Sequence, residues 1–269
     1  MIAQRIHNEL RKRYNPDGSA LRNLQLALLD ILVEFDIFAR SNHIEYSISY
    51  GTLLGAIRHK GYIPWDDDVD IMMTREEWNK FKLYIRPNGY ITDNIYVHGS
   101  VRPELHVDGK GIVDIFIFDY VPHHLFFDWL KTGLSMAVIT LIKCKARIIS
   151  KSYTKRVKPW YVFIPVAALF NMKTLIKWKE KLAIMYTPPK MHADDQVRAL
   201  NNGPKDMVKK HDYGILLGDK IDVDFEGYKF MAIPQYDAFL REWYGDYMQL
   251  PTNPTNLGRV TGKDLCGIR

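Results

Sequence analysis

Apolar residues return at helical spacing near the start of the chain. Over residues 20–42 they recur every three or four positions, which predicts an amphipathic helix with one face in a core. Ser19 precedes this run and is suited to cap it. Residues 1–18 are polar and charged, and we expect a lead-in that ends in the turn Asn15-Pro16-Asp17-Gly18. The long helix is expected to serve the core and to carry no chemistry of its own.

The pattern then changes to short strands. Residues 44–50 predict one strand, and residues 68–73 predict a second in which carboxylates lead into a buried apolar segment. Thr74-Arg75-Glu76-Glu77 has the spacing of a capping box, so a helix is expected from there to about Tyr84. Residues 90–118 predict short strands with a hairpin turn at Asp108-Gly109.

The second half of the chain favours helices. Residues 123–187 predict helices, residues 190–219 predict an irregular polar loop, and residues 220–248 predict a short hairpin and a helix. These elements predict an α/β (α+β) fold, in which helices flank a mixed sheet. We expect a single domain over residues 1–269, with a helical, basic and apolar insertion at about 123–190.

The richest chemistry lies in residues 66–70, where four aspartates occupy five positions. In a strand, residues two apart point to the same face, so Asp68 and Asp70 would project together. Two close carboxylates repel unless a cation lies between them, and Mg²⁺ usually takes one or two carboxylates plus phosphate oxygens. The pair therefore predicts a metal site. A polar turn after Pro64 that caps the next element is the alternative.

Two further positions fit such a site. Gly51-Thr52 follows a predicted strand and precedes an apolar helix, a joint at which backbone N–H groups can approach an anion. Asp114 is the one charged residue in the apolar run 112–118, where burial is costly without a partner or a cation. Asp114 would complete the metal site or take a proton from an acceptor. It could instead pair with a buried Arg or Lys.

The stretch from Gly51 to Asp70 resembles the LicD family of bacterial phosphocholine transferases, to which the fukutin-related proteins are related, within the nucleotidyltransferase superfamily. Residues 225–234, and residues 240–248 with Pro251, are similar to a second block of that family. The resemblance covers about residues 20–120 and 220–252. It implies a nucleotidyltransferase-type sheet.

The resemblance also implies a reaction. Phosphocholine, or a similar phospho-alcohol, would pass from a CDP-activated donor, CDP-choline foremost, to a sugar hydroxyl. The acceptor would be a cell-surface glycan precursor (teichoic acid, lipopolysaccharide or capsule) that could be lipid-linked, and CMP would leave. Asp68 and Asp70 would hold Mg²⁺, or Mn²⁺ in its place, and Asp114 would be a third ligand or the general base.

The resemblance gives roles to neighbouring residues as well. Asp66 would be an outer metal ligand, whereas Asp67 is expected at a cap or in solvent. The phosphate contacts would come from the basic triplet Arg58, His59 and Lys60, although His59 could equally be a structural hydrogen-bonding residue. Trp65 and Tyr62 could form an aromatic surface for a quaternary ammonium group, but we favour packing under the turn.

Three alternatives remain open. A nucleotidyltransferase would use the same metal site to move a nucleoside monophosphate to a small molecule and release pyrophosphate. A non-enzymatic protein of the membrane surface would have a degenerate site, which the intact aspartates speak against. A glycosyltransferase with an Asp-x-Asp motif is more distant, since it would want a nucleotide-binding βαβ unit where this chain opens with a helix.

Composition and charge make the surface of a membrane one candidate location for the protein. The net charge is +6, and residues 143–158 hold seven basic and no acidic residues. Nearby Trp160 and Tyr161 suit an anionic bilayer surface, although a solvated basic helix is the alternative. No nucleic-acid module is apparent. The apolar stretches 132–142 and 159–172 are each shorter than a spanning helix needs. Two distant cysteines and a polar N-terminus favour a cytoplasmic protein, peripheral on the inner face of the membrane.

Overall fold

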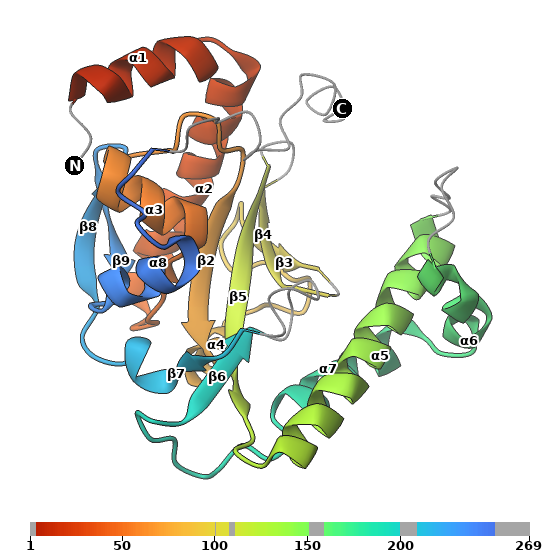
Figure 1. The fold of residues 1–269 in the computed structure, drawn as a ribbon. Helices are drawn as coiled ribbons and strands as arrows, with labels where there is room; N and C mark the ends of the chain where they lie inside the picture. The colour runs from red at the N-terminus through yellow and green to blue at the C-terminus, as the bar shows by residue number, and fades with distance from the viewer. Residues whose placement is uncertain (1–3, 100, 108–110, 151–158, 200–208, 251–269) are drawn as a thin grey trace. The chain divides into compact units, whose positions relative to one another are not determined.

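A computed structural model describes the chain except for six short ranges (Figure 1). The described residues are 4–99, 101–107, 111–150, 159–199 and 209–250. They form two compact units. Unit 1 comprises Met1–His98, Glu104–Ile115 and Ile215–Arg269, and unit 2 comprises Gly99–Pro103 and Phe116–Gly214.

Two helices open unit 1, and one of them departs from expectation. The predicted long helix is α2 (Ala20–Ser41), and the Ser19 side chain accepts a hydrogen bond from the Arg22 N–H, as a cap should. The lead-in expected over residues 1–18 is instead helix α1 (Gln4–Tyr14). The prediction was wrong because α1 is polar and has no apolar stripe to mark it in the sequence. It packs on the rest of unit 1 through the rings of His7 and Tyr14, which contact His59 and Trp65.

The sheet of unit 1 has the order β1-β2-β5-β4-β3. The strands are β1 (Ser47–Ile48), β2 (Val69–Thr74), β3 (Tyr96–His98), β4 (Glu104–Val107) and β5 (Gly111–Val121), the last of which continues into unit 2. The strand predicted over residues 44–50 is shorter than expected, because helix α3 (Tyr50–His59) already begins at Tyr50. β4 and β5 pair antiparallel, as a hairpin requires, and the predicted turn at Asp108-Gly109 lies outside the described residues.

The predicted helix after the aspartates is α4 (Arg75–Lys82). The Thr74 hydroxyl accepts from the Glu77 N–H at 3.3 Å, which is one half of the expected capping box. The Glu77 carboxylate instead accepts from the Glu45 N–H and from Lys80. The buried rings of Trp78 and Phe81 face the core, so α4 holds the end of β2 in place.

The C-terminal part of unit 1 is the predicted hairpin and helix. The hairpin is β8 (Ile221–Phe225) with β9 (Tyr228–Ala232), and the helix is α8 (Tyr236–Tyr244). The Ile233 N–H donates to the Ser47 hydroxyl at 3.0 Å, which ties the end of β9 to β1. The ring of Phe239 on α8 packs against Tyr50 at the start of α3.

Unit 2 is mainly helical, as expected for residues 123–187. Its helices are α5 (Leu125–Ser150), η1 (Pro159–Phe163), α6 (Ile164–Ala168) and α7 (Met172–Ala183). The loop predicted over residues 190–219 is wrong in part, because β6 (Gln196–Ala199) pairs with β5 and β7 (His211–Asp212) pairs with β6. These strands are too short to show a period in the sequence. The mixed α/β class, with helices that flank a sheet, is confirmed, while the single domain stays a prediction.

Helix α5 corrects one further expectation. Among the described residues, it is long and apolar enough to cross a membrane by length and composition alone. The apolar segment predicted over 132–142 begins seven residues earlier, at Leu125, because Asp128 and Lys131 interrupt the sequence pattern without ending the helix. Most of the basic residues in 143–158 lie outside the described part of the chain, whereas Lys143, Lys145 and Arg147 are on α5.

Candidate active site

A cavity of about 490 Å³ lies in unit 1, between residues 50–70 and the stretch 244–250, which comprises the end of α8 and the residues after it. Its wall consists of Tyr50, Gly51, Leu54, Arg58, Ile63, Trp65, Asp66, Asp68, Asp70, Tyr244, Asp246, Tyr247, Gln249 and Leu250. These residues come from two stretches of the chain that are far apart in sequence. The cavity is therefore built by tertiary structure around a local motif.

Carboxylates dominate one part of this wall. One oxygen from each of Asp66, Asp67 and Asp68 lies within 4.8 Å of the other two, and the buried Asp70 lines the same cavity. Burial and then the neighbouring Asp68 raise the pKa of Asp66 well above its ordinary value. Asp67 is part of the cluster, although the sequence favoured a cap or solvent for it. This set of oxygen donors fits a divalent cation such as Mg²⁺.

Gly51 and Thr52 hold the aspartates in position. A Cβ atom on Gly51 would lie 2.6 Å from Asp66 Oδ2, so only glycine lets this carboxylate come so close to helix α3. The Thr52 hydroxyl accepts from the Asp70 N–H at 2.9 Å. Gln25 on α2 donates to the Asp66 carbonyl at 2.8 Å. Gly51 lines the cavity, while Thr52 acts on the site through the backbone of Asp70.

Arg58 brings a buried positive charge to the cavity. Its Nη1 donates to the carbonyls of Tyr247 and Gln249, at 2.8 and 3.2 Å, and its Nε donates to His59. Among the described residues, Arg58 forms no ion pair with a carboxylate. Burial lowers the pKa of Arg58 to about 10, so the group stays charged at neutral pH. A buried cation without a carboxylate partner is suited to bind an anionic group.

The other two members of the basic triplet lie away from the cavity wall. His59 is buried between Arg58 and the imidazole of His7, whose Nδ1 lies 3.2 Å from that of His59. Burial, and then Arg58 and His7, lower the pKa of His59 to about 3, so the imidazole is neutral at neutral pH. These contacts fit the structural hydrogen-bonding role that the sequence left open for His59. The Lys60 side chain points to the β8–β9 hairpin, 3.9 Å from Asp224.

Glu226 fixes the loop between α3 and the aspartates, a role that the sequence did not reveal. Its carboxylate accepts from the Tyr62 N–H and pairs with Arg22 of α2 at 2.6 Å. Its own N–H donates to the Lys60 carbonyl. A Cβ atom on Gly61 would lie 2.4 Å from Glu226 Oε1, so glycine is needed where this side chain passes. The turn of the β8–β9 hairpin thus holds the loop between α3 and the aspartates in place.

Aromatic side chains form another part of the wall. Trp65 lines the cavity and also packs edge-on against Tyr14, and its role as a surface for a quaternary ammonium group stays a prediction. Tyr50, Tyr244 and Tyr247 line the cavity too, and the sequence had offered the 240–248 block only as part of a resemblance. Burial and then Asp70 raise the pKa of Tyr244 well above its ordinary value. The Tyr247 hydroxyl donates to Asp237 of α8 at 2.7 Å.

Asp114 lies on β5, outside the cavity wall and the aspartate cluster as described. It is directly across from Glu104 on β4, which is in turn across from His98 on β3. Directly opposite residues of antiparallel strands share a face, so these three side chains project from the same side of the sheet. Val113 and Leu105 are buried on the other side. The assignment of Asp114 as a metal ligand or a general base stays a prediction.

Comparison with known proteins places this geometry in a family context. Residues 43–121 match the family model described as "LicD/FKTN/FKRP, nucleotidyltransferase domain". The chain is 28% identical over 252 residues to the lipopolysaccharide cholinephosphotransferase LicD of Haemophilus influenzae, an alignment that spans 86% of this chain and 92% of that protein.

Two further relatives are uncharacterized proteins of Rickettsia. The protein of Rickettsia typhi is 38% identical over 98 residues, or 35% of this chain and 29% of its own length. The protein of Rickettsia prowazekii is 25% identical over 202 residues, or 70% of this chain and 66% of its own length. The resemblance to the LicD family that the residues from Gly51 to Asp70 predict is thus confirmed.

Proposed function

We propose that this protein transfers phosphocholine from CDP-choline to a sugar hydroxyl of lipopolysaccharide or a related cell-surface glycan and releases CMP. The observation that carries the proposal is the cavity wall of unit 1, which combines aspartates, a buried arginine and tyrosines. The similarity to the Haemophilus cholinephosphotransferase over most of both chains supports this substrate class. Teichoic acid and capsule precursors are acceptors of the same chemistry.

The aspartates and Arg58 would bind the donor diphosphate in different ways. Asp66, Asp68 and Asp70 would hold Mg²⁺ or Mn²⁺, which supplies neutralisation of the diphosphate and of the leaving CMP. Arg58 would contact a phosphate oxygen, because its buried guanidinium has two nitrogens engaged with neutral groups and no carboxylate partner among the described residues. Gly51 keeps Asp66 close to helix α3, and Thr52 fixes the backbone of Asp70.

The tyrosines favour choline as the transferred alcohol. A quaternary ammonium group cannot donate a hydrogen bond, so proteins bind it with aromatic faces and nearby negative charge. Tyr50, Tyr244 and Trp65 line the cavity that also holds the aspartates. The same wall would bind a polyol less well, since a polyol needs hydrogen-bond partners for each hydroxyl group.

In the reaction, the oxygen of a sugar hydroxyl forms a bond to the choline-bearing phosphorus as the bond from that phosphorus to CMP breaks. The hydroxyl proton must leave at the same time. The resemblance to the LicD family offers Asp114 as the base that removes it, although Asp114 lies on β5 outside the cavity wall. Positioning and charge neutralisation supply most of the rate in such transfers, so the remaining residues need only hold the groups in line.

A second function has one specific observation in its favour. The family model that matches residues 43–121 is described as a nucleotidyltransferase domain. Under this alternative, the same aspartates would serve the transfer of a nucleoside monophosphate to a small molecule, with pyrophosphate as the leaving group. The products separate the two: CMP supports the phosphocholine transferase, and pyrophosphate supports the nucleotidyltransferase.

The first experiment is a thermal-shift screen with CDP-choline, CDP-ribitol, CDP-glycerol, CTP and ATP, each with and without Mg²⁺. A ligand that binds only the folded protein raises its melting temperature by mass action. We expect the largest Mg²⁺-dependent rise with CDP-choline, and the same rise in the control variant Asp224→Asn, whose side chain is exposed on the hairpin. Stabilisation by CTP or ATP alone, with pyrophosphate release, would overturn the proposal in favour of the nucleotidyltransferase.

A further inference from the structure

Helix α5 of unit 2 buries the charged side chains of its first half and leaves several of its large apolar side chains exposed. The only charged residues between Leu125 and Ile142 are Asp128 and Lys131, and both are buried. Ser135 is buried one turn further along the same side. At about 100° per residue, these three residues fall on one half of the helix, together with the apolar core residues Val138 and Ile142.

Structural contacts occupy the buried polar groups. Lys131 is 2% exposed, and its ammonium group donates to the carbonyls of Tyr120 and Ala183 at 2.7 and 2.8 Å. Asp128 forms an ion pair with Arg198 and another with Lys210. Because these groups serve contacts inside unit 2, the opposite half of α5 is left without a charge over more than four turns.

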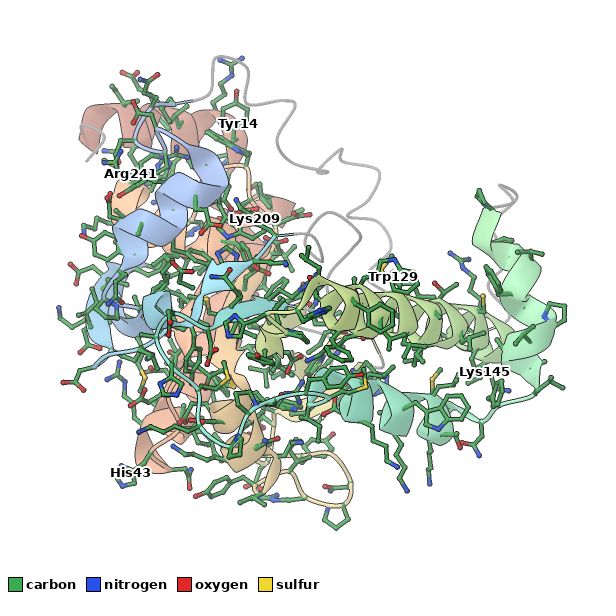
Figure 2. The ribbon with its side chains drawn as sticks, turned by 60° about the horizontal axis from the view of Figure 1, so that its bottom comes forward. Tyr14, His43, Trp129, Lys145, Lys209 and Arg241 are labelled. Carbon is green, nitrogen blue, oxygen red and sulfur yellow. The ribbon has the colours of Figure 1, made fainter. Side chains whose placement is uncertain are left out.

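That opposite half is an exposed apolar face. It includes Leu125, Phe126, Trp129, Gly133, Leu134 and Ala137, and Leu125 and Trp129 are 78% and 70% exposed. Figure 2 shows Trp129 on α5. The helices that follow add exposed Val162, Phe163, Val166 and Leu169. Contiguous apolar patches of this kind on a protein surface mark sites that bind a protein or a membrane.

Positive charge accompanies the apolar face along the same helix. Lys143, Lys145 and Arg147 follow on α5, and residues 143–158 contain no acidic residue. The Arg147 guanidinium lies over the ring of Tyr161, and Lys145 donates to the Ala168 carbonyl, so these cations belong to the surface formed by α5, η1 and α6. An apolar face with tryptophan and phenylalanine, continued by lysine and arginine, suits the interface of an anionic bilayer.

We propose that the exposed face of α5 binds the surface of an anionic membrane, with Leu125, Phe126 and Trp129 inserted among the acyl chains and the cations against the lipid headgroups. This arrangement gives the helix a position in the plane of the interface. A spanning position would place Lys131, Asp128 and the Arg198 that pairs with Asp128 in hydrocarbon, where charge is costly. The inference does not need the proposed reaction, because it concerns unit 2 alone.

The test is flotation of the full chain with vesicles of phosphatidylcholine alone or with an equal amount of phosphatidylglycerol. The variant Phe126→Ser/Trp129→Ser removes the two exposed rings, and Leu83→Ser/Tyr84→Ser is the matched control, because Leu83 is 84% exposed in unit 1. We expect the α5 variant to lose at least about tenfold in binding to anionic vesicles, and the control to float like the parent protein.

A second variant tests the charges separately. Lys143→Gln/Lys145→Gln/Arg147→Gln is expected to lose about tenfold or more on anionic vesicles and to lose nothing on neutral ones. Flotation that is absent in the parent protein, or equal in the parent and the α5 variant, would overturn the proposal. Resistance of the bound protein to carbonate extraction would replace it with a spanning helix. A parent oligomer that the α5 variant dissociates, with no vesicle binding by either, would show a protein interface instead.

Discussion

The cavity of unit 1 and helix α5 of unit 2 depart from the usual division of residues in opposite directions. Charged groups normally face water, and large apolar side chains are normally inside. The cavity wall buries Asp70 and Arg58, whereas α5 exposes Trp129 and Leu125 and buries Lys131. The Lys131 ammonium group donates to two carbonyls inside unit 2, whereas burial and the neighbouring Asp68 raise the pKa of Asp66 at the cavity. The contrast is in keeping with the two proposals, an ionic ligand at the cavity and an apolar environment at α5.

The largest expected effect separates the two regions. Asp68→Asn or Asp70→Asn should lower choline phosphate transfer by about 10³-fold, because each removes a carboxylate charge from the cation site. The fold and the flotation with anionic vesicles should not change, since both residues lie in unit 1. A CMP-release assay and the flotation assay provide the two measurements. Near-normal turnover in either variant would end the metal assignment.

The frame of the cavity depends on one buried ion pair. Glu226→Ala removes the carboxylate that pairs with Arg22 and accepts from the Tyr62 N–H, so we expect a loss of about 3 kcal/mol in the free energy of unfolding. Urea denaturation measures it. Asp17→Ala is the control, because its ion pair with Arg11 is exposed and should contribute less than about 1 kcal/mol. Equal losses of unfolding free energy in both variants would show that the Glu226–Arg22 ion pair stabilises the fold no more than an exposed pair does.

The buried His59 predicts a pH dependence of stability. Its pKa is lowered from 6.5 to about 3, so the unfolded state binds the proton more tightly than the folded state. The stability is therefore complete above pH 6.5 and falls as the pH decreases towards 3, by up to about 1.4 kcal/mol for each pH unit. Thermal unfolding across this range should show a slope that His59→Gln reduces. The exposed His43→Asn variant should keep the slope of the parent protein.

The smallest effects come from one glycine in each region. Gly51→Ala places a Cβ atom against Asp66, and we expect a loss of about tenfold in kcat/KM as that carboxylate moves. Gly133→Ala on α5 meets nothing within 4 Å and should raise the free energy of unfolding by about 0.5–1 kcal/mol. Steady-state kinetics and denaturation measure the two changes. A harmless Gly51→Ala would show that Asp66 is not held where the reaction needs it.

The sequence predicted those helices and strands whose formation depends on residues close together in the chain. Helix α2, the Thr74 cap and the β8–β9 hairpin follow from apolar spacing and turn chemistry, and the sequence alone was sufficient for them. Helix α1 was missed because its contacts are made by single aromatic rings rather than by a stripe.

The residues of the site also fall into two groups, those that the sequence could predict and those that only the structure reveals. The aspartates and Gly51 are close in sequence and could be found there. Tyr244, Tyr247 and Glu226 act on the site from more than 150 positions away, and only the folded chain reveals that Arg58 bonds to the carbonyl of Tyr247. Their part in the wall depends on long-range contacts, which a single sequence does not display.

The order of the chain has a consequence for the protein while it is being made. The ribosome delivers the aspartates before residues 244–250, so the cavity wall stays incomplete until that later stretch has been made. In a nascent chain that ends before Tyr247, the Arg58 guanidinium lacks the carbonyls of Tyr247 and Gln249 that hold it, and the later part of the cavity wall is missing. Under the proposed function, we expect chains that stop before Tyr244 to bind the donor less tightly than chains that include residues 244–250.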